Sequence, residues 1–234
     1  MDIEEINKKY KEIRNKYLES YIKDDEIINE AISFFNSYYN LYEHPFTLED
    51  INTISNISFS LKIDFLHWSA IQPKSEKEII NFYRNTPFEF FKNLLKNMDI
   101  MHYESIFNLN ILPFLNKNNV HTILDYGGGS GYMSLLLEKM KYKTTFSEIN
   151  KLSIEWMKHI VKKFNYNIDI IDLYDNQIEN NYDAIIIKDV IEHILEPEEL
   201  LSCLNKKTKP LIIIPNKMEK VEDYLPQHFP YILK

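Results

Sequence analysis

All four glycines of this 234-residue chain lie within five consecutive positions, at Gly127, Gly128, Gly129 and Gly131. Glycine is favoured where the backbone needs a positive φ or must approach another group without a Cβ in the way. Because the chain uses glycine nowhere else, even at its turns, the sequence predicts that this loop belongs to a functional site.

The segments around the glycines predict a strand before the loop and a helix after it. Residues 120–124 form a short apolar run with β-branched residues, and residues 132–140 have a helical composition. A strand, a glycine loop and a helix form a nucleotide-type site at the carboxyl edge of a sheet. The dinucleotide fingerprint is disfavoured because counting from Gly127 places Tyr132 where its sixth residue, a glycine, is needed. A triphosphate loop is disfavoured because no Gly-Lys-Ser or Gly-Lys-Thr follows.

The segment 125–131, Asp-Tyr-Gly-Gly-Gly-Ser-Gly, has an acidic residue at the end of the strand and glycines at alternate positions. It resembles the first motif of class I S-adenosylmethionine-dependent methyltransferases of the small-molecule type, and the resemblance covers roughly residues 119–216. The resemblance implies a Rossmann-like α/β fold with an open, mostly parallel sheet, and S-adenosyl-L-methionine as the cofactor. It also implies cofactor contacts from Asp125, Tyr126, Gly127, Gly128, Gly129, Gly131 and Lys188.

Glu148 ends the strand-like run 143–148, about 20 residues beyond the glycines. A carboxylate at this position can accept two charge-assisted hydrogen bonds from the ribose hydroxyls of an adenosine. The alternative is a solvated acid that interacts favourably with the dipole of a helix over residues 151–164. We favour the ribose contact.

Residues 167–172 predict a third strand, which ends at Asp172 and is followed by Leu173. In the family this position lies beside the adenine, so the resemblance implies that Asp172 accepts from the exocyclic amine and that Leu173 flanks the ring. Asp169 competes for the same role, and Asp172 is preferred because it lies at the carboxyl end of the strand. A plain loop acid is the alternative.

Residues 182–188 predict a buried fourth strand, which runs into Asp189-Val-Ile-Glu-His193 and then into a helix opened by Pro197. This form is seen in many small-molecule methyltransferases of the class. Methyl transfer to a hydroxyl requires a base with a pKa near neutrality, which favours histidine. His193, with Asp189 nearby, is therefore the first catalytic candidate, and a residue that only braces the loop is the alternative.

A helix that precedes the sheet, over residues 101–107, supplies two further candidates. His102 is the second candidate base, and the resemblance implies that Tyr103 contacts the methionine end of the cofactor. The carboxylates around His193 do not predict a metal site, because no second cluster of ligands accompanies them.

The chain divides into two expected regions. Residues 1–115 predict a helical lid or substrate region, because they lack glycine, carry helical apolar spacing and are interrupted by prolines. Residues 116–234 predict the cofactor-binding α/β domain, with a fifth strand at 209–215. Too few residues follow for the helix and two strands that the family usually adds. Either the sheet is trimmed or the chain is a fragment with a further C-terminal domain, which we favour.

Composition limits the classes of partner. With 44% hydrophobic and 26% charged residues the chain is an ordinary globular protein. A net charge of -8 provides no field that attracts nucleic acid, so no nucleic-acid partner is expected. The absence of a long apolar run or a signal peptide predicts no membrane partner and a cytoplasmic location. The sequence does not determine the oligomeric state.

The leading function is methylation of oxygen, nitrogen or carbon in a small-molecule acceptor such as a sugar or a secondary metabolite. A methyltransferase for a protein-bound or carrier-bound substrate is the second hypothesis. A non-catalytic binding module with the methyltransferase fold is the third.

Overall fold

The computed structural model describes residues 25–50, 53, 68, 70–71, 75–86, 111–208 and 211–214. The chain divides into two compact units, one formed by Met1–Ile54 and Leu95–Asn119, the other by Ser55–Leu94 and Val120–Lys234. The sequence-based boundary near residue 115 differs from this division, because a segment of the expected helical region belongs to the same unit as the sheet. The lid role of residues 1–115 stays a prediction.

The first unit contains helices α2 (Asp25–Tyr38) and α8 (Ile111–Lys117). The Asn36 side chain holds the segment after α2, because its Nδ2 donates to Phe46 O at 3.0 Å and its Oδ1 accepts from Phe46 N at 2.7 Å. Thr47 and Asp50 exchange backbone-to-side-chain hydrogen bonds of 2.8 and 3.2 Å. These reciprocal bonds form a capping box at the start of a helix that begins at residue 48.

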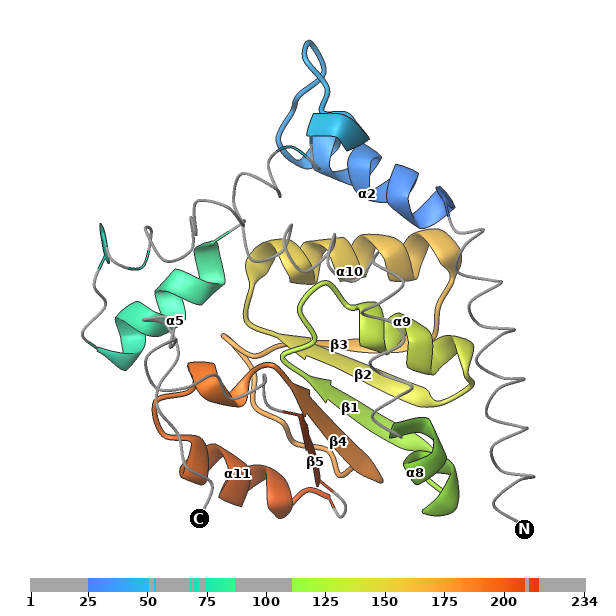
Figure 1. Cartoon of the computed structure of the whole chain (residues 1–234), viewed down its shortest axis with the longest axis vertical. Helices are drawn as coiled ribbons and strands as arrows, with labels where there is room; N and C mark the ends of the chain where they lie inside the picture. Colours follow the sequence, from blue (N-terminus) through green and yellow to red (C-terminus); the bar gives the residue numbers. More distant parts are fainter. Residues whose placement is uncertain are drawn as a thin grey trace. The chain divides into compact units, whose positions relative to one another are not determined.

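The second unit is built on a parallel sheet. Within the described residues its strands are β1 (Thr122–Tyr126), β2 (Lys143–Glu148), β3 (Ile168–Asp172), β4 (Ala184–Lys188) and β5 (Leu211–Ile214). Their order is β3-β2-β1-β4-β5 and every pairing is parallel (Figure 1). The predicted open, Rossmann-like sheet is therefore confirmed.

The strand order determines where a ligand can bind. The chain runs outward from β1 to β3 and then returns to β4 on the other side of β1. Ligands of open α/β sheets bind at such a reversal, outside the carboxyl ends of the strands. The segments that follow β1 and β4 meet at this point, and they carry the glycine loop and His193.

Helices cover both faces of the sheet. The elements are α9 (Tyr132–Lys139), α10 (Lys151–Phe164), α11 (Pro197–Asn205), a short 3₁₀ helix η1 (Ile191–His193) and α5 (Glu76–Asn85). Alternation along β1 assigns the faces: Asp125 accepts a hydrogen bond from Ser134 of α9, whereas Leu124 packs with Leu204 of α11. Figure 1 shows α9 and α10 on one side of the sheet and α11 on the other.

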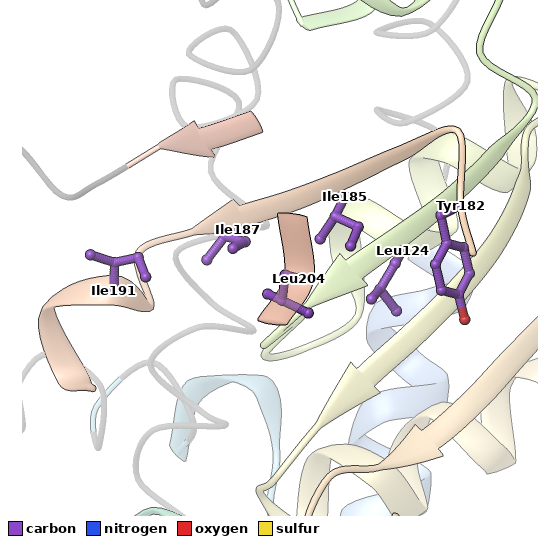
Figure 2. Packing of buried hydrophobic residues seen from close by; sticks show 6 residues of the cluster. All are labelled: Leu124, Tyr182, Ile185, Ile187, Ile191 and Leu204. Atoms are coloured by element: carbon purple, nitrogen blue, oxygen red, sulfur yellow. The ribbon is translucent and has the colours of Figure 1, made fainter. Parts of the chain in front are cut away.

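One apolar cluster connects the sheet to the segment that carries His193. Figure 2 shows its buried members, which come from β1, the segment before β4, β4 itself, η1 and α11: Leu124, Tyr182, Ile185, Ile187, Ile191 and Leu204. Full burial of an aliphatic side chain stabilises a fold by about 1.5 to 3 kcal/mol. Ile191 is 3% exposed and lies two residues before His193, so packing against the sheet fixes η1 in place.

Local sequence signals account for the starts of α5, α10 and α11. Ser75 and Glu78 form a capping box at α5, Asn150 caps α10, and Pro197 occupies the first turn of α11. The first strand was expected at residues 120–124, but β1 is Thr122–Tyr126. The difference arises because β1 pairs along its length with residues 143–147 of β2, a long-range partner.

Candidate functional site

The loop after β1 has the backbone that its glycines predict. Gly127, Gly129 and Gly131 have φ of 68°, 57° and 78°, in the left-handed region that favours glycine. A Cβ on Gly127 would lie 2.5 Å from Cγ2 of Val190, in the loop that follows β4. Because Gly127 has no side chain, the loop after β1 can contact the loop after β4 at the point where the strand order reverses.

Helix α10 and strand β2 hold this loop in place by hydrogen bonds. The amides of Gly127 and Gly128 donate to Ser147 O at 2.9 and 3.0 Å, and Nε1 of Trp156 donates to Ser130 O at 3.1 Å. A Cβ on Gly128 would lie 2.7 Å from the buried Phe146 ring. Gly128 thus shapes the loop.

A cavity of about 400 Å³ opens at the carboxyl ends of the strands, and all of its lining residues belong to the second unit. Among the residues predicted from sequence, seven line it: Tyr126, Gly127, Gly129, Glu148, Leu173, Asp189 and His193. Five others do not line it: Asp125, Gly128, Gly131, Asp172 and Lys188. His102 and Tyr103 lie outside the described residues.

Glu148 is held rigidly at the wall of the cavity. Its Oε2 accepts from Gly129 N at 2.7 Å, and its Oε1 accepts from Ile149 N and Asn150 N at 2.6 and 3.0 Å. Burial raises the pKa of this carboxyl, and the three amide bonds act in the opposite direction. The residue is 8% exposed, so it is not the solvated helix acid that was the alternative. A carboxylate has about four acceptor positions, and the amides use three of them.

Asp125 faces α9 rather than the cavity. It is 2% exposed and its Oδ2 accepts from Ser134 Oγ at 2.7 Å. Burial raises its pKa to about 6, the Ser134 bond opposes the rise, and the charge of Glu148 adds to it. Asp125 therefore connects the end of β1 to α9 and does not line the cavity.

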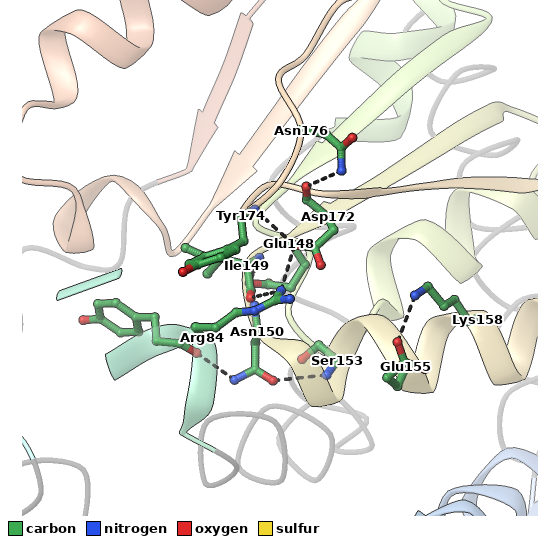
Figure 3. A network of polar contacts seen from close by, with 11 residues as sticks. Arg84, Glu148, Ile149, Asn150, Ser153, Glu155, Lys158, Asp172, Tyr174 and Asn176 are labelled. Atoms are coloured by element: carbon green, nitrogen blue, oxygen red, sulfur yellow. Dashed lines mark hydrogen bonds and ion pairs between the residues drawn. The ribbon is translucent and has the colours of Figure 1, made fainter. Parts of the chain in front are cut away.

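Asp172 anchors helix α5 (Figure 3). Its Oδ1 accepts from Arg84 Nη1 at 2.7 Å and from Tyr174 N at 3.0 Å, and Arg84 also donates to Ile149 O at 2.9 Å. The Arg84 guanidinium carbon lies 4.9 Å from the centroid of the Tyr174 ring. Leu173 lines the cavity and Asp172 does not. An adenine contact by Asp172 stays a prediction.

Asn150 is the second anchor of α5. Its Oδ1 accepts from Ser153 N at 3.1 Å and caps α10, while its Nδ2 donates to Tyr83 O and Thr86 O, both at 2.9 Å. The two carbonyls belong to the last turn of α5 and the residue after it, where intrahelical partners run out. Asn150 thus holds α5 in place as a wall of the cavity.

His193 faces Tyr83 of α5. Its Nδ1 lies 2.8 Å from the Tyr83 hydroxyl oxygen, and the two ring centroids are 5.2 Å apart. Asp189 begins the same segment with φ of 52°, and its Oδ2 accepts from Lys188 Nζ at 2.8 Å. Tyr126 also lines the cavity, and burial raises its pKa to about 12, so its hydroxyl stays protonated.

A family model and several solved structures match part of this chain. The family model described as a methyltransferase domain matches residues 101–214. Over residues 101–214, this chain is therefore similar to methyltransferase domains. A search of curated proteins found no match.

Several solved structures are similar to the methyltransferase domain. The N-terminal domain of EvdMO1 with SAH bound is 15% identical, over 44% of this chain and 46% of that chain, with a TM-score of 0.40. The PH0226 protein from Pyrococcus horikoshii OT3 is 20% identical, over 63% and 65%, with a TM-score of 0.45. A SAM dependent methyltransferase from Aquifex aeolicus is 24% identical, over 50% and 69%, with a TM-score of 0.41. The chain spans about half the length of EvdMO1's domain and of a Clostridium acetobutylicum methyltransferase.

The residues of the methyltransferase domain fit S-adenosylmethionine. Gly127 and Gly129 present a backbone without side chains to the cavity, and Glu148 retains one acceptor position on Oε2 for a ribose hydroxyl. The expectation of two free positions is reduced to one, because the loop amides compete for the same oxygens. Leu173 adds an apolar side chain to the lining of the cavity.

Sequence reasoning missed the contribution of α5. Glu76, Ile79, Ile80 and Tyr83 line the cavity, although only the helix at 101–107 was expected there. The capping box at Ser75 is a local signal for the start of this helix, but no local pattern shows which long-range partner the helix meets. Within the part of the chain that the structure describes, no group of three or more metal-binding side chains is clustered, and no helix is long and apolar enough to span a membrane.

Proposed function

We propose that this protein transfers the methyl group of S-adenosylmethionine to a small-molecule acceptor. The observation that carries the proposal is the position of two groups on one cavity. Glu148, fixed by the glycine-loop amide of Gly129, lies on the wall formed by β1 and β2, and His193 lies on the wall formed after β4. A cofactor-holding carboxylate and a candidate base thus share one cavity.

The residues have separate roles in this proposal. Gly127, Gly129, Glu148 and Leu173 hold the adenosyl part of the cofactor. The cofactor supplies an activated methyl group, so the protein mainly aligns the acceptor and removes a proton where the acceptor has one to lose. His193 takes that proton and α5 excludes water from the cavity.

The lining of the cavity favours an uncharged or cationic acceptor. Five acidic residues are among those that line it, Glu76, Glu148, Asp189, Glu196 and Glu199, and no lysine or arginine occurs among the lining residues that the structure describes. An acceptor with a phosphate or carboxylate would be repelled, because charges interact strongly where water is excluded. A sugar or a secondary metabolite meets this requirement, and we expect the reaction in the cytoplasm, where S-adenosylmethionine is made.

Calorimetric titration of the purified chain with S-adenosylmethionine, S-adenosylhomocysteine and NAD tests the cofactor part. Micromolar binding of the two adenosyl compounds and no binding of NAD would support it. Absence of adenosyl binding by folded protein would refute it.

An acceptor screen tests the reaction. S-adenosylhomocysteine release is followed with sugars, phenols and amines, and with the phosphorylated form of each active compound. Turnover of the neutral compounds and not of their phosphorylated forms is expected. Cofactor binding without turnover of any small acceptor, but with labelling of a protein, would favour the protein-substrate hypothesis. Binding with no transfer at all would favour the non-catalytic module.

A further inference from the structure

Two groups of elements bound the cavity. The residues proposed to hold the cofactor follow β1 or lie at the ends of β2 and β3: Gly127, Gly129, Glu148 and Leu173. A second wall comes from α5 and from the segment that runs from β4 into α11. The Tyr83 hydroxyl oxygen lies 2.8 Å from Nδ1 of His193, so α5 and this segment meet directly. The second wall is therefore the one that an acceptor can contact.

Helix α5 presents apolar side chains to the cavity. Four of its residues line the cavity: Glu76, Ile79, Ile80 and Tyr83. Spacings of three and four positions place them on one face of the helix. Ile79 is 8% exposed and belongs to a buried cluster, whereas Ile80 is half-buried. Ile80 therefore keeps accessible apolar surface at the cavity.

The segment that runs from β4 into α11 is also apolar where it lines the cavity. It contributes four aliphatic residues: Val190, Ile194, Leu195 and Leu200. Val190 and Leu200 pack against the apolar cluster that includes Leu124 and Leu204, so their positions are fixed. Leu195 is 46% exposed and keeps most of its contact surface for another molecule. Together with Ile79 and Ile80, these four residues form what we call the apolar subsite.

The apolar subsite is continuous with the cofactor residues. Both line one cavity of about 400 Å³, a volume that is typical of small-molecule sites. A compound held in the subsite would therefore lie beside the cofactor, where an acceptor must be placed for methyl transfer.

We propose that the apolar subsite binds the carbon body of the acceptor, and that the acceptor is an uncharged compound with an apolar ring or chain rather than a sugar. This inference rests on the proposed function and makes it narrower. A sugar carries a hydroxyl on nearly every carbon, and each hydroxyl that lost its water against an aliphatic wall without a new partner would weaken binding. An apolar body gains from the same transfer in proportion to the area that leaves water.

The acidic residues of the second wall do not favour a sugar. Glu76, Glu196 and Glu199 line the cavity and are exposed, so their carboxylates stay hydrated. A hydrogen bond from a sugar hydroxyl to a hydrated carboxylate replaces one from water, so its net contribution is small. The selective contacts of this wall are therefore those of its aliphatic side chains.

The first test measures binding and does not depend on catalysis. Phenols with para-methyl, para-ethyl, para-propyl and para-butyl groups are titrated into the protein by calorimetry, with and without saturating S-adenosylhomocysteine. Glucose is the polar comparison. We expect the Kd to fall about two- to fourfold for each added methylene until the subsite is full, with a negative heat-capacity change, and no binding of glucose. No binding of any alkylphenol, or a Kd that does not depend on chain length, would overturn the proposal.

The second test places a polar group on each side of the apolar subsite. Ile80→Asn changes α5, where isoleucine and asparagine have similar helix propensity, and Leu195→Asn changes an exposed position of the other segment. Each variant should bind para-butylphenol about 4- to 15-fold more weakly, the effect of one or two buried methylene groups. The Kd of S-adenosylhomocysteine should stay within about twofold of the native value. Native affinity for para-butylphenol in both folded variants would overturn the proposal.

Ile71→Asn is the matched control. Ile71 is 46% exposed, as Leu195 is, and belongs to the same unit, but it does not line the cavity. This variant should bind para-butylphenol with the native Kd, and circular dichroism verifies the fold of all three variants. A loss of affinity as large as in Ile80→Asn would show a general effect of the substitution and overturn the assignment to the subsite.

Failure of this inference and failure of the proposed function give different results. Length-dependent binding of alkylphenols by a protein that transfers no methyl group to any acceptor would refute the proposed function and leave the subsite. Methyl transfer to a sugar, without binding of alkylphenols, would refute the subsite and leave the proposed function.

Discussion

Replacement of Glu148 by glutamine tests the geometry of the cofactor site most directly. The change keeps the shape of the side chain and replaces one carboxylate oxygen by an NH₂ group, which has no acceptor capacity. In the native protein Oε2 accepts from Gly129 N and Oε1 accepts from Ile149 N and Asn150 N. Whichever way the amide is turned, its NH₂ group faces at least one backbone N–H donor.

The expected loss of affinity follows from the number of acceptor positions. Three amides use three of about four positions, so one charge-assisted bond to a ribose hydroxyl is lost, which is about 1.5 to 3 kcal/mol. S-adenosylhomocysteine should therefore bind about 10- to 150-fold more weakly. An amide left without an acceptor also costs about 1 to 3 kcal/mol of unfolding free energy, so the melting temperature of the ligand-free variant should fall.

Isothermal titration calorimetry gives the Kd, and thermal unfolding without ligand gives the stability. Glu155→Gln is the control, because Glu155 lies on the exposed face of α10, pairs only at the surface with Lys158, and changes charge by the same amount. A Kd within about twofold of the native value, in a folded Glu148→Gln protein, would refute the assignment of Glu148 to the ribose.

Two further variants test the fold around the loop. In the folded protein the pKa of Asp125 is raised from 3.8 to about 6. Between these two pH values the folded state binds more protons than the unfolded chain. The free energy of unfolding therefore falls as the pH rises through this range, by about 3 kcal/mol at most. Urea unfolding at pH 4 and pH 7 should therefore show Asp125→Asn gaining stability relative to the native protein at the higher pH; a gap that does not change with pH would contradict the burial argument. Gly131→Ala should lower the melting temperature, because φ is 78° and the new Cβ would lie 1.8 Å from Sδ of Met157. In a Met157→Ala background the same change should cost less, and strict additivity would show that the clash is absent.

The linear order of elements was accessible from the sequence. The glycine loop, the strand that ends at Glu148 and the helix opened by Pro197 are each encoded by neighbouring residues, and the structure has them at the predicted positions. Periodicity and capping act over one or two turns of chain, so they can be detected locally. The parallel sheet followed from the alternation of strands with helices.

The sequence did not predict which residues of α5 contact the segments that follow the strands. Asp172 was expected beside an adenine, but the structure pairs it with Arg84, 88 positions earlier. Tyr83 was not among the predicted site residues, and it faces His193. Such pairs form because α5 packs in the same unit as the sheet, which no local pattern encodes.

The sequence alone determined the loop, the cofactor class that it implies, and the catalytic candidate His193. The tertiary structure decided which acids line the cavity, how many acceptor positions Glu148 retains, and which side chain lies beside the imidazole of His193. The physical reason is the range of the interactions. Backbone conformation is governed by neighbours in the chain, whereas burial and hydrogen-bond partnership depend on segments that meet only when the fold is complete.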